Sequence, residues 1–142
     1  MNFASAYDLR EAPDILYRLL EERPPETWIS HQAMPTREAH QKFIWSKPYV
    51  WWFLIEAGGE YIGDLCVTDL NEIGIHIFRR FQRKGYATRA LDWFIETHEP
   101  LMGIPAKRCG YWLANVALGN EASKSFFRKA GFAPGQDTYA KR

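Results

Sequence analysis

Residues 79–89, RRFQRKGYATR, combine residue types that could bind a phosphate group. Five of these eleven residues are cationic and none is acidic, and Gly85 and Ala87 stand two apart in the middle. Small residues leave the backbone open to an anion, and unpaired N–H groups at a helix start attract negative charge. Arg and Lys side chains around such a turn add mobile positive charge. The segment therefore predicts a turn that binds a diphosphate.

The motifs of common nucleotide sites are missing from this sequence. It contains neither the eight-residue loop that ends in Gly-Lys-Ser/Thr nor the Gly-x-Gly-x-x-Gly fingerprint. Residues 82–87 instead read Gln-Arg-Lys-Gly-Tyr-Ala, which fits the pattern Gln/Arg-x-x-Gly-x-Gly/Ala. This hexapeptide resembles the pyrophosphate loop of the GCN5-related N-acetyltransferases (GNAT), a family that binds acetyl-CoA.

Two neighbouring segments extend the resemblance to about residues 60–132. Residues 72–78, EIGIHIF, precede the loop as that family's fourth strand does, and a helical pattern follows it as the family's third helix does. Residues 115–132, NVALGNEASKSFFRKAGF, resemble the family's last helix, with Asn-x-x-Ser near its start and Lys-x-Gly-Phe at its end. The sequence is most similar to the ribosomal-protein N-acetyltransferase-like branch. The resemblance is vague over the first fifty residues, where the family builds its acceptor site.

The resemblance implies that acetyl-CoA is the acetyl donor and that its pantetheine arm lies between the fourth and fifth strands. Main-chain groups of Ile77 and Arg79 would bond to the pantetheine, and an N–H near Ile77 would hold the thioester carbonyl. Such an oxyanion donor is worth roughly 3 kcal/mol in other acyl-transfer enzymes. The donor-binding residues that the resemblance implies are Ile77, Phe78, Arg79, Gln82, Arg83, Lys84, Gly85, Tyr86, Ala87, Thr88, Asn115, Asn120 and Phe127.

The acceptor amine needs a base, because an amine of pKa about 10 is mostly protonated at neutral pH. Glu72 and His76 share one face of the strand expected at residues 72–78, near the expected thioester, so Glu72 is the first candidate and His76 the second. Each is also consistent with a purely structural role. Many family members carry a Tyr seven residues after the Asn of the last helix, where this chain has Phe127. Ser123 is therefore the candidate hydrogen-bond donor to the leaving thiol.

The predicted function is N-acetyl transfer from acetyl-CoA to a primary amine by direct attack in a ternary complex. A non-catalytic CoA-binding domain of the same fold is an alternative, because Phe127 cannot donate a proton. A small nucleic-acid-binding domain is a further alternative, against which the net charge of +1 counts. The acceptor could be a small molecule or a peptide amine. Its pocket could be lined by Trp28, Trp45, Trp51, Trp52 and Trp112, although such residues also simply pack.

The 142 residues are enough for one domain, residues 1–142, and 46% hydrophobic residues can fill its core. The pattern of elements indicates an α/β protein with a single mixed, mostly antiparallel central sheet flanked by about four helices. The resemblance makes this the acyl-CoA N-acyltransferase fold with a shortened C-terminus. Helical spacing predicts helices at residues 14–22, 37–47, 85–98 and 120–130. Strand patterns cover residues 2–7, 50–56, 61–68, 72–78, 108–116 and 136–141.

The remaining features exclude several classes of protein. Cys66 and Cys109 match no metal-ligand spacing and are interpreted as buried free thiols, so we expect no metal. No apolar stretch approaches the ~20 residues of a membrane span, and the N-terminus has no signal-peptide pattern. We expect a cytoplasmic monomer or homodimer with no membrane or nucleic-acid partner.

Overall fold

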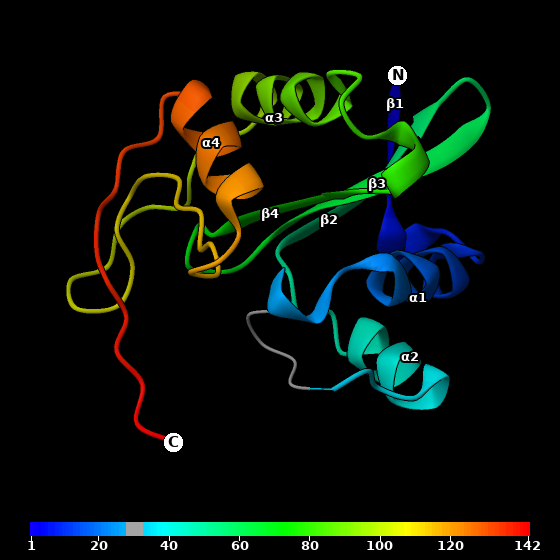
Figure 1. Cartoon of the computed structure of the whole chain (residues 1–142), viewed down its shortest axis with the longest axis horizontal. Coiled ribbons are helices and arrows are strands. Elements are labelled where there is room, and N and C mark those ends of the chain that lie inside the picture. The colour runs from blue at the N-terminus through cyan, green and yellow to red at the C-terminus, as the bar shows by residue number, and fades with distance from the viewer. Residues whose placement is uncertain (28–32) are drawn as a thin grey trace.

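The computed structural model describes residues 1–27 and 33–142. Four antiparallel strands form one sheet in the order β1-β2-β3-β4. Figure 1 shows this sheet at the centre of the molecule, with helices on both sides. The strands are β1 (Asn2–Ser5), β2 (Trp51–Ala57), β3 (Glu60–Val67) and β4 (Ile73–Ile77). The helices are α1 (Ala12–Glu22), α2 (Arg37–Trp45), α3 (Tyr86–Thr97) and α4 (Glu121–Lys129), with short 3-10 turns at Ala6–Asp8, Pro25–Thr27 and Arg79–Phe81.

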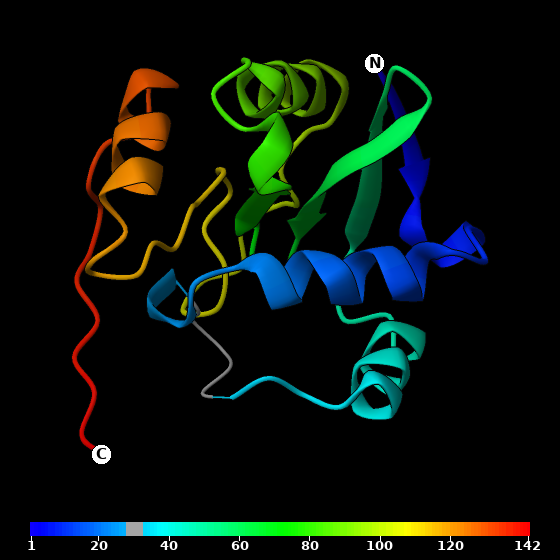
Figure 2. The ribbon, with the colours of Figure 1, turned by 45° about the vertical axis from the view of Figure 1, so that its right-hand side comes forward.

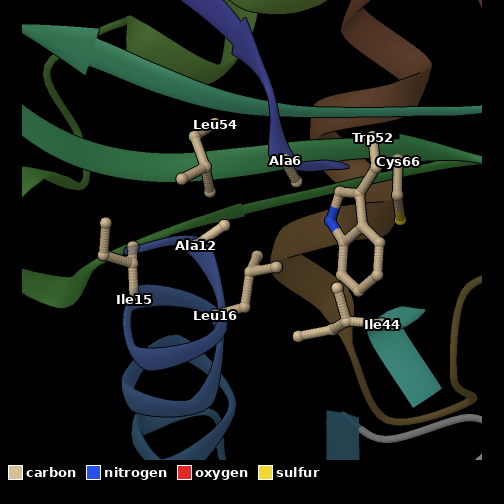
Figure 3. Packing of buried hydrophobic residues seen from close by; sticks show 8 residues of the cluster. All are labelled: Ala6, Ala12, Ile15, Leu16, Ile44, Trp52, Leu54 and Cys66. Atoms are coloured by element: carbon tan, nitrogen blue, oxygen red, sulfur yellow. The ribbon is translucent and has the colours of Figure 1, made fainter. Parts of the chain in front are cut away.

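The helices divide between the two faces of the sheet. Figure 2 shows α1 and α2 on one face and α3 on the other, while α4 lies off to the side. Side chains alternate along β2, so Trp52 and Leu54 pack toward α1 and α2, whereas Ile55 packs toward α3. Figure 3 shows the hydrophobic cluster on the α1 and α2 side of the sheet, in which the indole of Trp52 lies beside Cys66 and Ile44. The expected α/β fold with an antiparallel sheet and four helices is confirmed.

Local signals in the sequence determine the helix ends. Thr36 caps α2 by accepting the Ala39 N–H at 3.1 Å, and Asn120 caps α4 by accepting the Ser123 N–H at 3.2 Å. At the end of α4, Gly131 takes a φ of 95° and the Phe132 N–H reaches back to the Phe127 carbonyl at 2.9 Å. These three boundaries agree with the helices expected from sequence.

The segment between α3 and α4 differs from expectation. A strand was expected at residues 108–116, but the structure has only two isolated bridges there. Leu113 pairs with Glu72 in a parallel bridge, and Arg108 pairs with Ile104 in an antiparallel one. The expected strand at 136–141 is also absent from the structure, which assigns no strand there and leaves residues 133–142 exposed. The second error follows from the first, because residues 108–116 offer no strand edge for the tail to pair with.

Asn71 explains why this segment is held without a strand ladder. It is fully buried and has a positive φ of 65°. Its amide nitrogen donates to the carbonyls of Leu101 and Cys109 at 3.0 and 2.8 Å, and its amide oxygen accepts the Leu101 N–H at 2.8 Å. The Asn71 side chain therefore anchors the start of the returning chain, which leaves the edge of β4 after the bridge at Leu113.

The pairing of β3 with β4 requires a glycine at position 63. The β2–β3 register shifts between Ile55 and Glu56, which marks a bulge next to Gly63. A Cβ on Gly63 would lie 2.2 Å from the carbonyl oxygen of His76 and 2.8 Å from Cδ1 of Ile77. Because the first of these atoms belongs to the backbone of β4, it cannot yield without disrupting the strand pairing.

We predict that Gly63→Ala lowers the free energy of unfolding by about 3 kcal/mol, since overpacking of a rigid site costs this much. Urea unfolding followed by circular dichroism measures the change. Gly135→Ala is the control, because no described atom lies within 4 Å of a Cβ at that position. Equal stability of the two variants would contradict the described contact.

Candidate active site

The end of β4 leads into the basic turn and then into α3. The Gln82 side chain donates to the Ile77 carbonyl at 2.9 Å and closes the turn. Arg83 and Gly85 have positive φ values of 61° and 80°, which reverse the chain before α3 begins. The expected donor-binding residues from Ile77 to Thr88 therefore follow one another in a single bend.

The N-terminus of α3 fits an anionic group. Its N-cap is Gly85, which provides no side-chain cap, so the first N–H groups of the helix keep their donor capacity. No atom of the described residues lies within 4 Å of a Cβ at Gly85, so the space above this residue is open. Arg83, Lys84 and Arg89 are exposed around it. These features suit a diphosphate, whose oxygens accept hydrogen bonds from backbone N–H groups.

The outer edge of β4 has main-chain groups that no neighbouring strand in the described ranges uses. The sheet order ends at β4, and the Ile73 N–H donates across this edge to Leu113 at 2.8 Å. Main-chain groups alternate between edges, so Ile75 and Ile77 face the same way as Ile73. Phe78 faces the opposite edge, where its N–H donates to the Ile62 carbonyl at 2.9 Å. The edge at Ile75 and Ile77 is the part of β4 that could pair with an extended ligand.

Arg79 is engaged with α1 in this structure. Its N–H donates to the Glu22 carboxylate, and its guanidinium lies 3.5 Å from the Glu22 carbonyl oxygen. A main-chain contact between Arg79 and pantetheine would therefore require Glu22 to release this N–H.

Glu72 lies just before β4, beside the Leu113 bridge, and both of its carboxylate oxygens have partners. The Thr68 hydroxyl donates to one oxygen at 2.9 Å, and the Asn115 amide donates to the other. These two expected site residues, Glu72 and Asn115, thus bind one another at the far end of β4 from the basic turn. Their contacts hold the returning chain to the sheet.

His76 forms a chain of hydrogen bonds with the buried residues Asp64 and Trp52, and its own side chain is partly exposed. Asp64 stands opposite His76 in the β3–β4 register, and its Oδ1 lies 2.7 Å from His76 Nδ1. The indole N–H of Trp52 donates to the other Asp64 oxygen at 2.8 Å. A carboxylate only accepts hydrogen bonds, so Nδ1 carries the hydrogen and the neutral ring keeps a lone pair on Nε2. This arrangement makes His76 Nε2 a base whose tautomer is set by its neighbour.

Gly74 gives the His76 ring its space. A Cβ on Gly74 would lie 3.5 Å from Cε1 of His76, 3.9 Å from its Nε2 and 3.0 Å from Sγ of Cys66. The ring therefore lies over the bare backbone of β4, on the side of the sheet that faces α1.

A small cavity of about 50 Å³ lies between α1, α2 and this face of the sheet, and His76 reaches it. Burial raises the pKa of the Cys66 thiol and of the Tyr49 hydroxyl, so both groups stay protonated near neutral pH. The residues that line this first cavity are Leu16, Leu19, Leu20, Arg23, His40, Phe43, Tyr49, Trp52, Asp64, Cys66 and His76.

A second cavity of about 110 Å³ lies next to the basic turn. Ile77, Arg79 and Gln82 form one side of it, and the end of α1 forms the other. Leu19 and Arg23 line both cavities, so these two side chains separate the His76 side from the side of the basic turn.

The expected residues on α4 lie beyond the edge of β4. Asn120 uses its side-chain oxygen as the helix cap, and Ser123 is partly buried in the first turn. The ring centroid of Phe127 lies 5.0 Å from that of Phe126 and 5.2 Å from that of Phe132. The Phe127 ring also packs against the core on the α3 side. Phe127 therefore helps to attach α4 to the rest of the molecule.

Of the tryptophans considered for an acceptor pocket, Trp52 is the one that lines the first cavity within the described ranges. Trp45 is 65% exposed on α2, and Trp28 lies outside the described residues. Trp51 and Trp112 lie on the α3 side of the sheet, with their ring centroids 6.1 Å apart.

Sequence reasoning did not select Asp64 or Arg23 as site residues. If the turn between the strands at 61–68 and 72–78 is centred on Leu70, Asp64 lies opposite His76. This register is the sequence feature that could have identified Asp64. Arg23 follows the last turn of α1 and precedes two prolines, a position that indicates a helix end and nothing about a site.

Two further findings concern metals and membranes in the described part of the chain. Within residues 1–27 and 33–142, no group of three or more His, Cys, Asp or Glu side chains is placed to hold a metal ion. None of the helices in the same ranges combines the length and hydrophobicity that crossing a bilayer requires.

A sequence model described as the acetyltransferase (GNAT) domain matches residues 5–133. No curated protein matches the sequence. Among solved structures, an acetyltransferase from Thermus thermophilus aligns with a TM-score of 0.69 and 21% identity, over 96% of this chain and 90% of that one. An aminoglycoside antibiotic 6′-N-acetyltransferase from Acinetobacter haemolyticus aligns with a TM-score of 0.64 and 16% identity, over 100% and 99%. A ribosomal-protein-alanine N-acetyltransferase from Brucella melitensis biovar Abortus 2308 aligns with a TM-score of 0.65 and 12% identity, over 99% and 97%. At these identities the structural likeness shows a shared fold.

The environment of the two thiols predicts selective alkylation. Burial raises the pKa of Cys66, so almost none of it is thiolate at about pH 8, whereas Cys109 is only partly buried. Iodoacetamide should modify Cys109 in the native protein and both cysteines in urea, as measured by peptide mass spectrometry. Comparable native labelling of Cys66 would show that the first cavity opens to solvent.

Proposed function

Because this chain belongs to the acetyltransferase (GNAT) family, we propose that it transfers the acetyl group of acetyl-CoA to a primary amine by direct attack in a ternary complex. The observation that carries the proposal is the Asp64–His76 pair, which lines a cavity on the α1 face of the sheet, where His76 belongs to the edge strand β4. A donor site and a base thus lie on adjoining parts of one strand.

The donor side of the proposal uses the basic turn and the open edge of β4. Acetyl-CoA would supply the acetyl thioester. The N–H groups from Arg83 to Thr88 would bind its diphosphate, and the main-chain groups of Ile75 and Ile77 would pair with its pantetheine arm. The support is the open space at Gly85, the uncapped start of α3 and the free strand edge.

On the acceptor side, we propose that the amine enters the first cavity. His76 Nε2 accepts the proton that the ammonium form must lose before its nitrogen can attack the acetyl carbon. Asp64 holds the ring in the required tautomer. We now favour His76 over Glu72 as the base, because Thr68 and Asn115 engage both carboxylate oxygens of Glu72.

The leaving sulfur acquires negative charge as its bond to the acetyl carbon breaks. We propose that the Ser123 hydroxyl donates a hydrogen bond to it, since Phe127 has no proton to donate. The amide nitrogen of Asn120 would contact the pantetheine, because its oxygen already caps α4. The thiol is acidic enough that weak assistance suffices.

Within the family, we propose that the chain stands closest to the ribosomal-protein branch, on the basis of the Asn-x-x-Ser segment at residues 120–123. The solved neighbours include proteins named for aminoglycoside and ribosomal-protein acceptors, so the fold alone does not choose the acceptor. A CoA-binding domain without catalysis would bind CoA and release none from acetyl-CoA with any amine.

The donor site predicts that Gly85→Asp abolishes CoA binding, because a carboxylate would repel the phosphates and fill the open space above Gly85. Isothermal titration with CoA measures the affinity, and we expect a loss of at least about 100-fold. Gly59→Asp is a matched control, since Gly59 has nearly the same φ, 81° against 80°, and similar open space on the β2–β3 turn. Equal CoA affinity in both variants would refute the turn as the phosphate site.

The proposed base predicts that His76→Gln lowers kcat/KM by about 100-fold or more. Glu72→Gln keeps an acceptor oxygen for Thr68 and should change the rate by less than about threefold. CoA release from acetyl-CoA measures both effects. A larger loss in Glu72→Gln than in His76→Gln would assign the base to Glu72.

The role of Asp64 predicts a rescue. In Asp64→Asn, the amide oxygen must face the Trp52 N–H, because the indole only donates. The amide N–H group then faces His76 Nδ1 and moves the ring hydrogen to Nε2, so the base is lost and kcat should fall at least about tenfold. Adding Trp52→Phe frees the amide to turn and should recover part of kcat. A further loss of kcat in the double variant, relative to Asp64→Asn, would contradict this tautomer control.

A further inference from the structure

Arg23 stands where the two cavities meet. It is the C-cap residue of α1, its side chain is half-buried, and it lines both the first and the second cavity. It therefore faces the space next to His76 as well as the space next to the basic turn. Among the described residues that line the first cavity, Arg23 alone carries a permanent positive charge.

The Arg23 guanidinium has no carboxylate partner among the side chains that the structure describes. Its one described hydrogen bond runs to the Thr27 carbonyl at 3.2 Å. Of the acids whose side chains the structure describes near Arg23, Asp64 accepts from His76 and Trp52, and Glu22 accepts from Arg79. Burial lowers the pKa of Arg23, with the Asp64 charge opposing this effect. A half-buried cation without an ion pair is costly unless a ligand completes it.

We propose that Arg23 binds a carboxylate of the acceptor, so that the substrate of this enzyme is a small amine that also carries a carboxylate. The inference rests on the proposed function, because it places the amine at His76. An arginine fork matches a carboxylate with two parallel hydrogen bonds, which fixes the orientation of the molecule between Arg23 and His76.

The charge of Arg23 also selects against other amines. A positive guanidinium beside the cavity disfavours a second positive charge, so polyamines are poor ligands for this space. The same charge favours the neutral form of the bound amine, which is the form that attacks. The cavity of about 50 Å³ has an apolar side made by Leu16, Leu19 and Leu20, so it suits a short aliphatic link between amine and carboxylate.

The substrate test compares pairs that differ only in the carboxylate. β-Alanine is matched with propylamine, and γ-aminobutyrate with butylamine, while spermidine serves as the polyamine. We expect kcat/KM to be at least about tenfold higher for the amino carboxylate of one pair than for its matched amine, as one well-placed charge-assisted contact gives. Equal rates within both pairs, or a preference for spermidine, would overturn the proposal.

The variant Arg23→Met removes the charge and keeps much of the apolar stem. It should abolish the preference for the amino carboxylate over its matched amine, while the KM for acetyl-CoA stays within about twofold. Arg18→Met is the control, because Arg18 pairs with Asp14 at 3.2 Å on the outside of α1. A raised KM for acetyl-CoA with an unchanged substrate preference would assign Arg23 to the donor instead.

A binding measurement separates this proposal from the proposed function. Amino carboxylates titrated calorimetrically into the CoA-saturated protein should bind to the wild type and lose at least about tenfold in affinity in Arg23→Met. Binding that depends on Arg23 without acetylation of any amine would sustain the carboxylate site and refute the catalytic function. Binding that is absent, or equal in wild type and Arg23→Met, would refute the carboxylate site. Melting temperatures of both variants confirm that they are folded.

Discussion

The antiparallel pairing of β3 with β4 is the constraint on which the site depends. It sets Asp64 opposite His76 on the face toward α1, and it sends the isoleucines of β4 toward α3. A slip of one residue would exchange the two faces and place the acid–histidine pair in the apolar core. The same strand ends the sheet, so its outer edge keeps main-chain groups for a ligand. One register therefore determines both the base and the strand edge that we assign to the donor.

Asp64 shows how a buried charge is tolerated here. Its side chain is only 5% exposed, and it receives one donor from Trp52 and one from His76. Removing a carboxylate from water is costly unless its oxygens are hydrogen-bonded, so the two donors offset the cost. Because the indole can only donate, Asp64 must accept from Trp52, and the direction of this hydrogen bond is fixed. A buried pair of this kind adds little to stability, and a catalytic role gives a reason for its presence.

Much of the fold could be predicted because its signals are local. Thr36 and Asn120 cap their helices, and Gly131 ends α4 with a left-handed residue. The turn between β4 and α3 could be predicted because its glycine and its cations are adjacent in sequence. The strand predicted at residues 108–116 is absent because a residue distant in sequence, Asn71, holds that segment by its side chain.

The missed site residues have the same physical explanation. Asp64 acts through residues on β2 and β4, and Arg23 acquires its position from the way α1 crosses the sheet. The placement of Glu22 against Arg79 likewise depends on that crossing. Contacts between elements distant in sequence leave no local pattern, so a single chain read by itself does not reveal them.

The anchoring of the returning chain by Asn71 has a consequence for how the molecule assembles. The strands and the three helices that cover the sheet all lie within the first 97 residues. The remaining chain joins this unit mainly at Asn71, the Leu113 bridge and the phenylalanines of α4. Formation of the sheet with its three helices, and docking of residues 98–142 onto it, are thus separable events in folding. A nascent chain can form the first unit before the last third of the chain is synthesised, and α4 then docks onto a surface that is already folded.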